Sequence, residues 1–231
     1  LHLLTMRKLH SFYVRLLRLQ VCVAFLTAPV LIAAETPGLV VTIATDTVDS
    51  NDNMTSLREA IAYANDKQGA DTITFSNGDN GTVNFHDDQA ETILLEGSEL
   101  LVSTEMSIIG PGAGKLEISG SQKSRIFQFA GQYSAKFVSG LSIRNGRTGI
   151  GSDYGGGGIL LLGGQLTLDG CEISGNTANY GGGICCTETT NGGARVTLTL
   201  VQCTVSGNSA SFGGGGIYTG YAQIHLTLVQ C

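Results

Sequence analysis

The stretch LTLDGCEISGN at residues 166–176 recurs as LTLVQCTVSGN at residues 198–208 and begins again as LTLVQC at residues 226–231. A weaker copy, VSGLSIRNG, occupies residues 138–146. Between copies lies a second block, in which an aromatic residue precedes a glycine run and an isoleucine. The aromatic residues are Tyr154, Tyr180 and Phe212. The equivalent positions Leu141, Cys171, Cys203 and Cys231 are 30, 32 and 28 residues apart, so the chain repeats with a period near thirty.

Each period contains short alternating runs separated by glycine and asparagine, and none of them has helical periodicity. Alternation gives a strand one inward and one outward face. The pattern predicts an all-β coil of parallel strands, in which successive turns pair about 4.8 Å apart and equivalent residues stack. Gly146, Asn176 and Asn208 share one position at a corner, where a positive φ is often needed and stacked asparagines can form ladders.

The composition supports a folded solenoid. Of the 33 glycines, 28 lie in residues 106–231, phased with the repeats, and the Gly-X-Y register of collagen is missing. A hydrophobic content of 42% argues against a disordered chain. The net charge of −6 argues against a nucleic-acid partner, which would require clustered Lys and Arg.

Residues 1–34 have the pattern of a secretory signal peptide. Four basic residues and no acidic residue come first, followed by the apolar run 19–34, which ends in Ala33-Ala34. An uncleaved anchor is the alternative, although the run is short for a membrane span. Met6 is the expected start of translation, with residues 1–5 as read-through.

Residues 35–105 form an acidic segment with 14 acidic and 2 basic residues. Ser56 and Glu59 have the spacing of a capping box, which predicts a short helix near 56–66 that packs on a core. No catalytic role is expected for Arg58 or Glu59. We therefore divide the chain into a leader, an N-terminal cap with the first turns at 35–105, and β-helix repeats at 106–231.

Two stretches resemble known families. Residues 40–75, with TSLREAI at 55–61 and ADTITF at 70–75, resemble the CSLREA domain of exported bacterial proteins, whose motif usually opens with Cys where this chain has Thr55. The glycine-isoleucine and Ile-Ser-Gly-Asn blocks resemble right-handed parallel β-helix repeats, including those of chlamydial polymorphic outer membrane proteins. The resemblance implies a pectate-lyase-like right-handed superhelix with an N-terminal cap, exported to the cell surface or outer membrane. It implies no particular chemistry, because such helices carry adhesins, lyases, hydrolases and spacers alike.

The cysteines of the repeats allow three interpretations. In an exported protein they could form disulfides between neighbouring turns. Leu141 at the equivalent position instead favours an inward apolar slot filled by buried thiols. The third interpretation, a metal site, lacks the Cys-x-x-Cys or His-pair spacing of zinc ligands, so we expect no metal and no cofactor.

The candidate carbohydrate-binding residues fall into two groups. The stacked aromatics Tyr154, Tyr180 and Phe212 make a platform for sugar rings if they are exposed, and an ordinary stack at the core edge if they are buried. A charged cluster between the first repeat copy and the first glycine run could contact an acidic sugar or could simply be a surface loop. Its members are Arg144, Arg147 and Asp153.

No catalytic residue is assigned. Asp169 and Glu172 are the nearest pair of carboxylates, but the next turn has Val201 and Thr204 in their places, so no acidic ladder follows. We expect an exported surface protein, adhesin-like or polysaccharide-contacting, without catalysis of its own. The alternative is a polysaccharide lyase or glycoside hydrolase whose catalytic turns lie partly outside this chain.

The expected partners are a polysaccharide or the surface of a host or neighbouring cell. Because the sequence stops inside a repeat, we expect a fragment. Its last turn would leave an unpaired strand edge that is prone to edge-to-edge self-association.

Overall fold

The computed structural model describes residues 37–148, 155–188, 195–220 and 223–231. The leader predicted at 1–34, Asp153 and Tyr154 therefore lie outside the described residues. Residues Glu35–Cys231 form one compact unit, so the acidic cap and the repeats belong to the same body.

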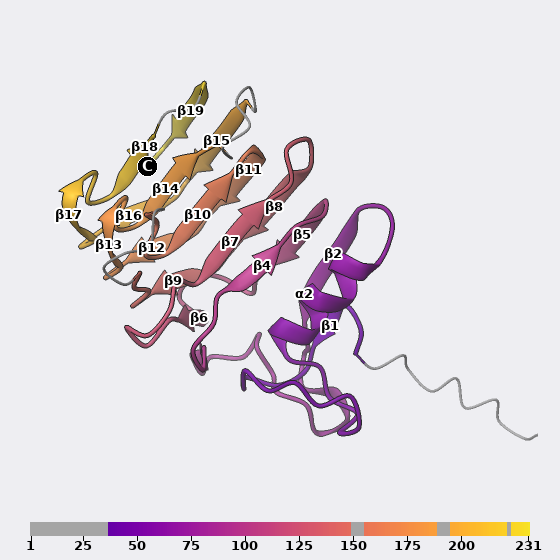
Figure 1. Ribbon diagram of the computed structural model, residues 1–231. Helices are drawn as coiled ribbons and strands as arrows, with labels where there is room; N and C mark the ends of the chain where they lie inside the picture. Colours follow the sequence, from indigo (N-terminus) through magenta and orange to yellow (C-terminus); the bar gives the residue numbers. More distant parts are fainter. Residues whose placement is uncertain (1–36, 149–154, 189–194, 221–222) are drawn as a thin grey trace, which may run out of the picture. The chain divides into compact units, whose positions relative to one another are not determined.

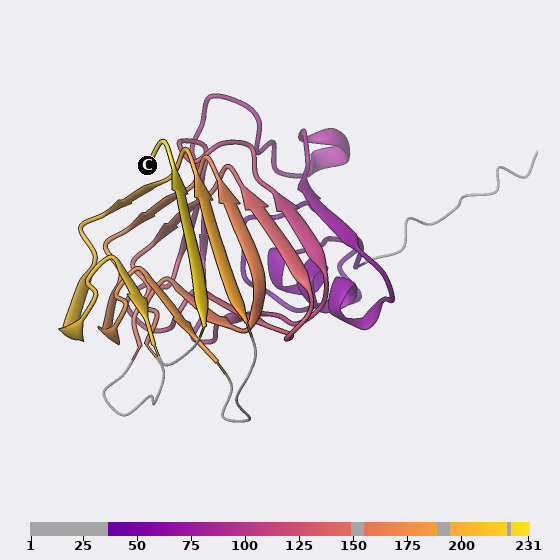
Figure 2. The same cartoon turned by 90° about the horizontal axis from the view of Figure 1, so that it is seen from above.

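The strands of this unit form a parallel β-helix, which confirms the predicted fold class. All pairings between its named strands are parallel. In each turn the chain passes through the first, then the third and then the second of the three sheets described below. Figure 1 shows the turns in sequence order, from indigo near the N-terminus to yellow at the C-terminus. In Figure 2 the strands of each sheet lie side by side, as expected for stacked turns.

The described chain arranges its strands in three sheets and a corner pair. In spatial order, the first sheet contains β1 (Val40–Val41), β2 (Asp71–Phe75), β5 (Met106–Ile109), β8 (Ala135–Ser139), β11 (Gly164–Asp169), β15 (Val196–Val201) and β19 (Ile224–Val229). The second contains β4 (Leu100–Val102), β7 (Phe127–Ala130), β10 (Ile159–Leu162), β14 (Ile184–Thr187) and β18 (Ile217–Thr219). The third contains β3 (Glu91–Leu94), β6 (Leu116–Ser119), β9 (Ser142–Arg144), β12 (Glu172–Ser174) and β16 (Thr204–Ser206). The corner pair consists of β13 (Thr177–Tyr180) and β17 (Ser209–Gly213), and a short 3-10 helix spans Asp79–Gly81.

The core consists of apolar columns that run from turn to turn. One column on the first sheet stacks Ile73, Ile108, Val138, Leu168 and Leu200, all fully buried. The in-register pairing predicted from the repeats therefore places equivalent side chains on top of one another. Each turn buries its inward face only because the neighbouring turns cover it.

Helix α2 (Leu57–Asp66) confirms the predicted short helix and its capping box. The Ser56 hydroxyl accepts from the backbone N–H of Glu59, and the Glu59 carboxylate accepts from that of Ser56. The helix covers the outer edge of β4: the Asn65 side chain donates to the Leu101 carbonyl at 2.7 Å and accepts from the Ser103 N–H at 2.9 Å. One asparagine thus takes the place that a neighbouring strand would have on this edge.

The asparagine ladder predicted at the corner is present. Asn176 is fully buried, and its Oδ1 accepts from the backbone N–H of Gly146 at 2.7 Å in the preceding turn. Its Nδ2 donates to the Ile143 carbonyl and to Asn208 Oδ1, both at 3.0 Å. The positive φ of this corner falls on the residue just before the ladder, which is glycine in two turns: Gly175 at +67° and Gly207 at +62°.

The cysteine column contains free thiols in the described turns. Cys171 and Cys203 are buried, and each thiol approaches a backbone carbonyl of the preceding turn. This favours the apolar-slot interpretation over an inter-turn disulfide. Cys231, at the end of the column, is exposed.

Lys136 occupies an inward position of the first sheet, between Met106 and Leu166. Only 3% of it is exposed, and its ammonium donates to the carbonyl of Ala130 and to the hydroxyl of Ser134. Burial lowers the pKa of Lys136 to about 8, and nearby Glu105 opposes this shift only in part. A buried lysine between two apolar neighbours therefore makes the core sensitive to pH.

We expect the free energy of unfolding to rise between pH 8 and the ordinary lysine pKa of about 10.4. In that window the unfolded chain keeps the Lys136 proton that the folded chain has lost, so raising the pH favours folding. Lys136→Met should remove up to about 3 kcal/mol of this rise. Urea unfolding of both proteins at several pH values measures the difference, and parallel curves for the two would contradict it.

Candidate functional site

An exposed aromatic patch lies where the corner pair meets the second sheet. It consists of Tyr180 at the end of β13, Phe212 in β17 and Tyr218 in β18. The ring centroids of Tyr180 and Phe212 are 5.5 Å apart, and those of Tyr180 and Tyr218 are 4.8 Å apart. Tyr180 is therefore the centre of a continuous apolar surface formed by two successive turns.

The glycine run after each aromatic residue positions this patch. A Cβ on Gly181 would lie 2.2 Å from the Ile184 carbonyl oxygen, and one on Gly182 would lie 2.2 Å from that of Ser209. Only glycine lets the chain approach so closely. The glycine run therefore packs closely against the backbone of its own turn and of the next turn, and the aromatic residue that precedes the run lies at the corner.

The two aromatic side chains differ in exposure. Tyr180 is 37% exposed, and Phe212, which belongs to the last described turn, is 71% exposed. Leu226 at the same end is 39% exposed, whereas its equivalent Leu198 one turn earlier is buried, so the platform interpretation stays a prediction. Large exposed aromatic side chains that gather in one place are typical of binding surfaces. Tyr154, the third aromatic residue of the predicted column, lies outside the described residues.

Tyr218 is the member of the patch that sequence reasoning missed. It pairs in register with Cys185, which in turn pairs with Leu160, so all three lie on the outward face of the second sheet. The sequence could have indicated this position, because the alternation of the strand places Ile217 inward and the next residue, Tyr218, outward. Leu160 and Cys185 are buried, whereas Tyr218 is partly exposed and packs against Tyr180.

The two stretches of sequence that contain the patch residues carry no charged side chain. Residues 173–187 and 196–224 contain no Asp, Glu, Lys or Arg. The side chains beside the rings are hydroxyls and amides, among them exposed Ser209 and Ser211 on β17. The side chains that these two stretches contribute are therefore suited to stacking and to neutral hydrogen bonding.

Arg144 and Arg147, the described members of the predicted charged cluster, have different surroundings. Arg144 lies on the third sheet, where it forms an ion pair with Glu172 and lies 3.9 Å from Glu117. Its hydrogen bond with Glu172 raises the pKa of Arg144. Arg147 is exposed, and its backbone bridges to Thr177 at the start of β13. Asp153 lies outside the described residues.

The carboxylates of Asp169 and Glu172 belong to two different strands. Asp169 ends β11, whereas Glu172 begins β12 and binds Arg144. That hydrogen bond lowers the pKa of Glu172, so its carboxylate stays ionised at neutral pH. An ionised, arginine-paired carboxylate is unsuited to act as a general acid.

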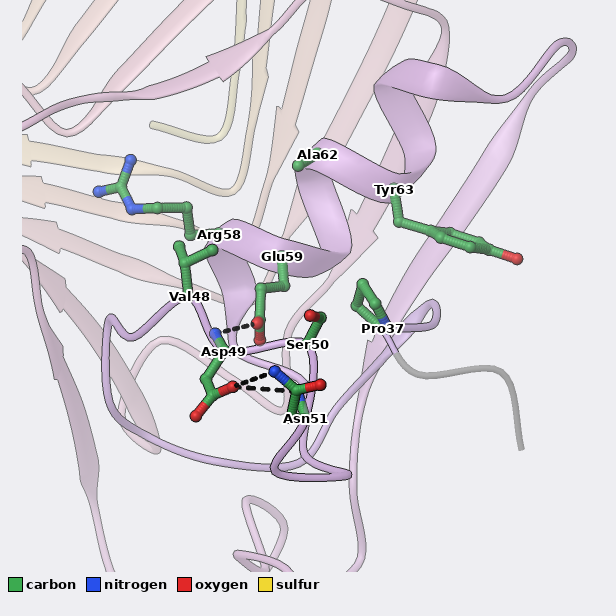
Figure 3. Close-up of a pocket in the computed structure, with 9 residues that line it drawn as sticks. All are labelled: Pro37, Val48, Asp49, Ser50, Asn51, Arg58, Glu59, Ala62 and Tyr63. Atoms are coloured by element: carbon green, nitrogen blue, oxygen red, sulfur yellow. Dashed lines mark hydrogen bonds between the residues drawn. The ribbon is translucent and has the colours of Figure 1, made fainter. Parts of the chain in front are cut away.

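A cavity of about 360 Å³ lies between α2 and the loop at 48–51 (Figure 3). Glu59 points toward this loop and accepts from the Asp49 backbone N–H at 2.7 Å, while Arg58 points away from it. Arg58 holds both carboxylate oxygens of Asp46 at 2.8 Å. Arg58 and Glu59 therefore have a structural role here, tying the cap loops to the helix.

The described part of the chain contains no cluster of three His, Cys, Asp or Glu residues that could hold a metal ion. Within the same residues, no helix has the length and apolarity needed to cross a membrane. Comparison of the chain with protein-family models, curated proteins and solved structures finds no match.

Proposed function

We propose that this chain is an exported surface protein whose β-helix contacts polysaccharide through the aromatic patch, without catalysis of its own. The observation that carries the proposal is the gathering of three aromatic rings at one corner, with the centroids of Phe212 and Tyr218 at 5.5 and 4.8 Å from that of Tyr180. Sugar rings bind the faces of aromatic side chains, and a solenoid presents such faces in a fixed array. Export rests on the leader pattern at residues 1–34.

The lyase or hydrolase alternative gains no comparable support from the described residues. The carboxylate pair considered for it is divided between two strands, and Glu172 is bound to Arg144.

The proposal predicts glycan binding that depends on the patch. On a glycan array, residues 35–231 should bind at least one glycan. The double variant Tyr180→Ala/Phe212→Ala should bind that glycan about tenfold more weakly or worse, because a tenfold loss of affinity corresponds to about 1.4 kcal/mol, the contribution of one aromatic contact. Tyr133→Ala is the matched control, because Tyr133 is 89% exposed and lies outside the patch. Failure of the unsubstituted protein to bind any glycan would overturn the proposal.

A further inference from the structure

We infer that Cys171 and Cys203 form a peroxide-sensitive thiol pair, which hydrogen peroxide converts into a reversible disulfide between two successive turns. The free thiols described above are the reduced form of this pair. The inference goes beyond the proposed function and does not depend on it. It rests on the stacking of the two cysteines and on the contact between their thiols.

The register of the neighbouring strands stacks the two cysteines. β11 pairs in register with β15 up to two residues before the cysteines, and β12 pairs with β16 from the residue after them. The Thr204 N–H donates to the Cys171 carbonyl at 2.9 Å. Successive turns are about 4.8 Å apart, and the Cα atoms of disulfides are about 4.4–6.8 Å apart. Cys171 and Cys203 are therefore close enough for a disulfide.

The contact between the two thiols makes them chemically different. The Cys171 thiol donates a hydrogen bond to the Cys203 sulfur, which raises the pKa of Cys171 and lowers the pKa of Cys203. Because the thiolate is the nucleophile, Cys203 is the sulfur that attacks an oxidant. Cys171 keeps its proton beside that sulfur, which is the position of a resolving cysteine.

The oxidation then has two steps. The Cys203 thiolate attacks one oxygen of hydrogen peroxide, the O–O bond breaks, and a sulfenic acid forms while the released hydroxide takes up a proton to become water. The Cys171 sulfur attacks the sulfenic sulfur, the S–O bond breaks, and the leaving hydroxide takes the Cys171 proton as a second water. Two thiols are oxidised to one disulfide, and one peroxide is reduced to two waters.

The burial of the pair favours a small oxidant. Both cysteines are only 2% exposed, so a molecule little larger than water has easier access than a disulfide such as oxidised glutathione. Cys185 and Cys186 are as buried but have no cysteine opposite them in the described neighbours β10 and β18. These two thiols are therefore an internal control for selectivity.

Peptide mapping of residues 35–231 with the substitution Cys231→Ser tests the inference. Cleavage after glutamate gives the peptides 118–172, 173–188 and 189–231, which then separate Cys171, the Cys185-Cys186 pair and Cys203. After treatment with hydrogen peroxide we expect 118–172 to be linked to 189–231, and dithiothreitol should release the link. The same treatment in urea is the control, because the unfolded chain should link its peptides without this selectivity.

A second variant tests the order of the two steps. Adding Cys171→Ala removes the resolving thiol, so Cys203 should accumulate as a sulfenic acid that dimedone labels. Circular dichroism verifies that each variant is folded. Peptides 118–172 and 189–231 that stay unlinked in the folded Cys231→Ser protein would overturn the inference, as would equal linkage of either peptide to 173–188. Labelling of Cys203 that does not increase in a folded Cys171→Ala variant would also contradict it.

Discussion

Replacing Asn176 by alanine is expected to lower the free energy of unfolding by about 3 kcal/mol or more. The substitution leaves the backbone N–H of Gly146 and the carbonyl of Ile143 without their buried partners, and each such group costs about 1–3 kcal/mol. It also removes the Nδ2 donor to Asn208 Oδ1. Equilibrium unfolding in urea, followed by circular dichroism, measures the loss.

Asn179→Ala is the matched control for this prediction. Asn179 lies three residues further along, in β13, and is only half-buried. Its removal should change stability by no more than about 0.5 kcal/mol. Equal effects at Asn176 and Asn179 would show that the ladder does not hold the turns together.

Gly182→Ala should destabilise the protein by about 3 kcal/mol or more, although alanine is the smallest possible addition. The new Cβ would lie 2.2 Å from the Ser209 carbonyl oxygen and 2.7 Å from that of Gly215, and both belong to the backbone of the next turn. Backbone oxygens in a paired stack cannot move aside as a flexible side chain can. Two neighbouring turns would have to separate locally.

Gly114→Ala isolates the steric cause. A Cβ at Gly114 would meet no atom within 4 Å, and the residue does not have a positive φ. This variant should be as stable as the parent, or slightly more so, because alanine restricts the unfolded chain. Thermal unfolding of both variants gives the comparison, and a Gly182→Ala protein as stable as Gly114→Ala would refute the close-packed arrangement.

The repeats allowed the fold to be predicted because stacking requires only that equivalent residues recur in phase. Leu168 and Leu200 share a position in the repeat, and the structure pairs them directly. The capping box of α2 was equally local, since Ser56 and Glu59 are three residues apart. Features of this kind depend on short spacings or on the period and can be read along the chain.

Contacts that depend on an atypical turn escaped prediction. Lys136 lies at an inward position because β8 pairs in register with β5 and β11, yet nothing in the sequence around this lysine indicates that it is buried. Arg144 and Glu172 are about one period apart, so their proximity could have been found, but their ion pair depends on side-chain direction. The contact of Tyr218 with Tyr180 joins the second sheet to the corner pair, and the repeat pattern does not show how these strands meet.

The two edges of the second sheet differ, because α2 covers the outer edge of β4. Asn65 occupies the backbone groups of the β4 edge, whereas β18, at the opposite edge, has only β14 as a neighbour in the described chain. Asn65→Ala would leave the Leu101 carbonyl and the Ser103 N–H on the β4 side of this sheet without their side-chain partner. The variant should therefore self-associate more than the parent protein, and sedimentation velocity measures the difference.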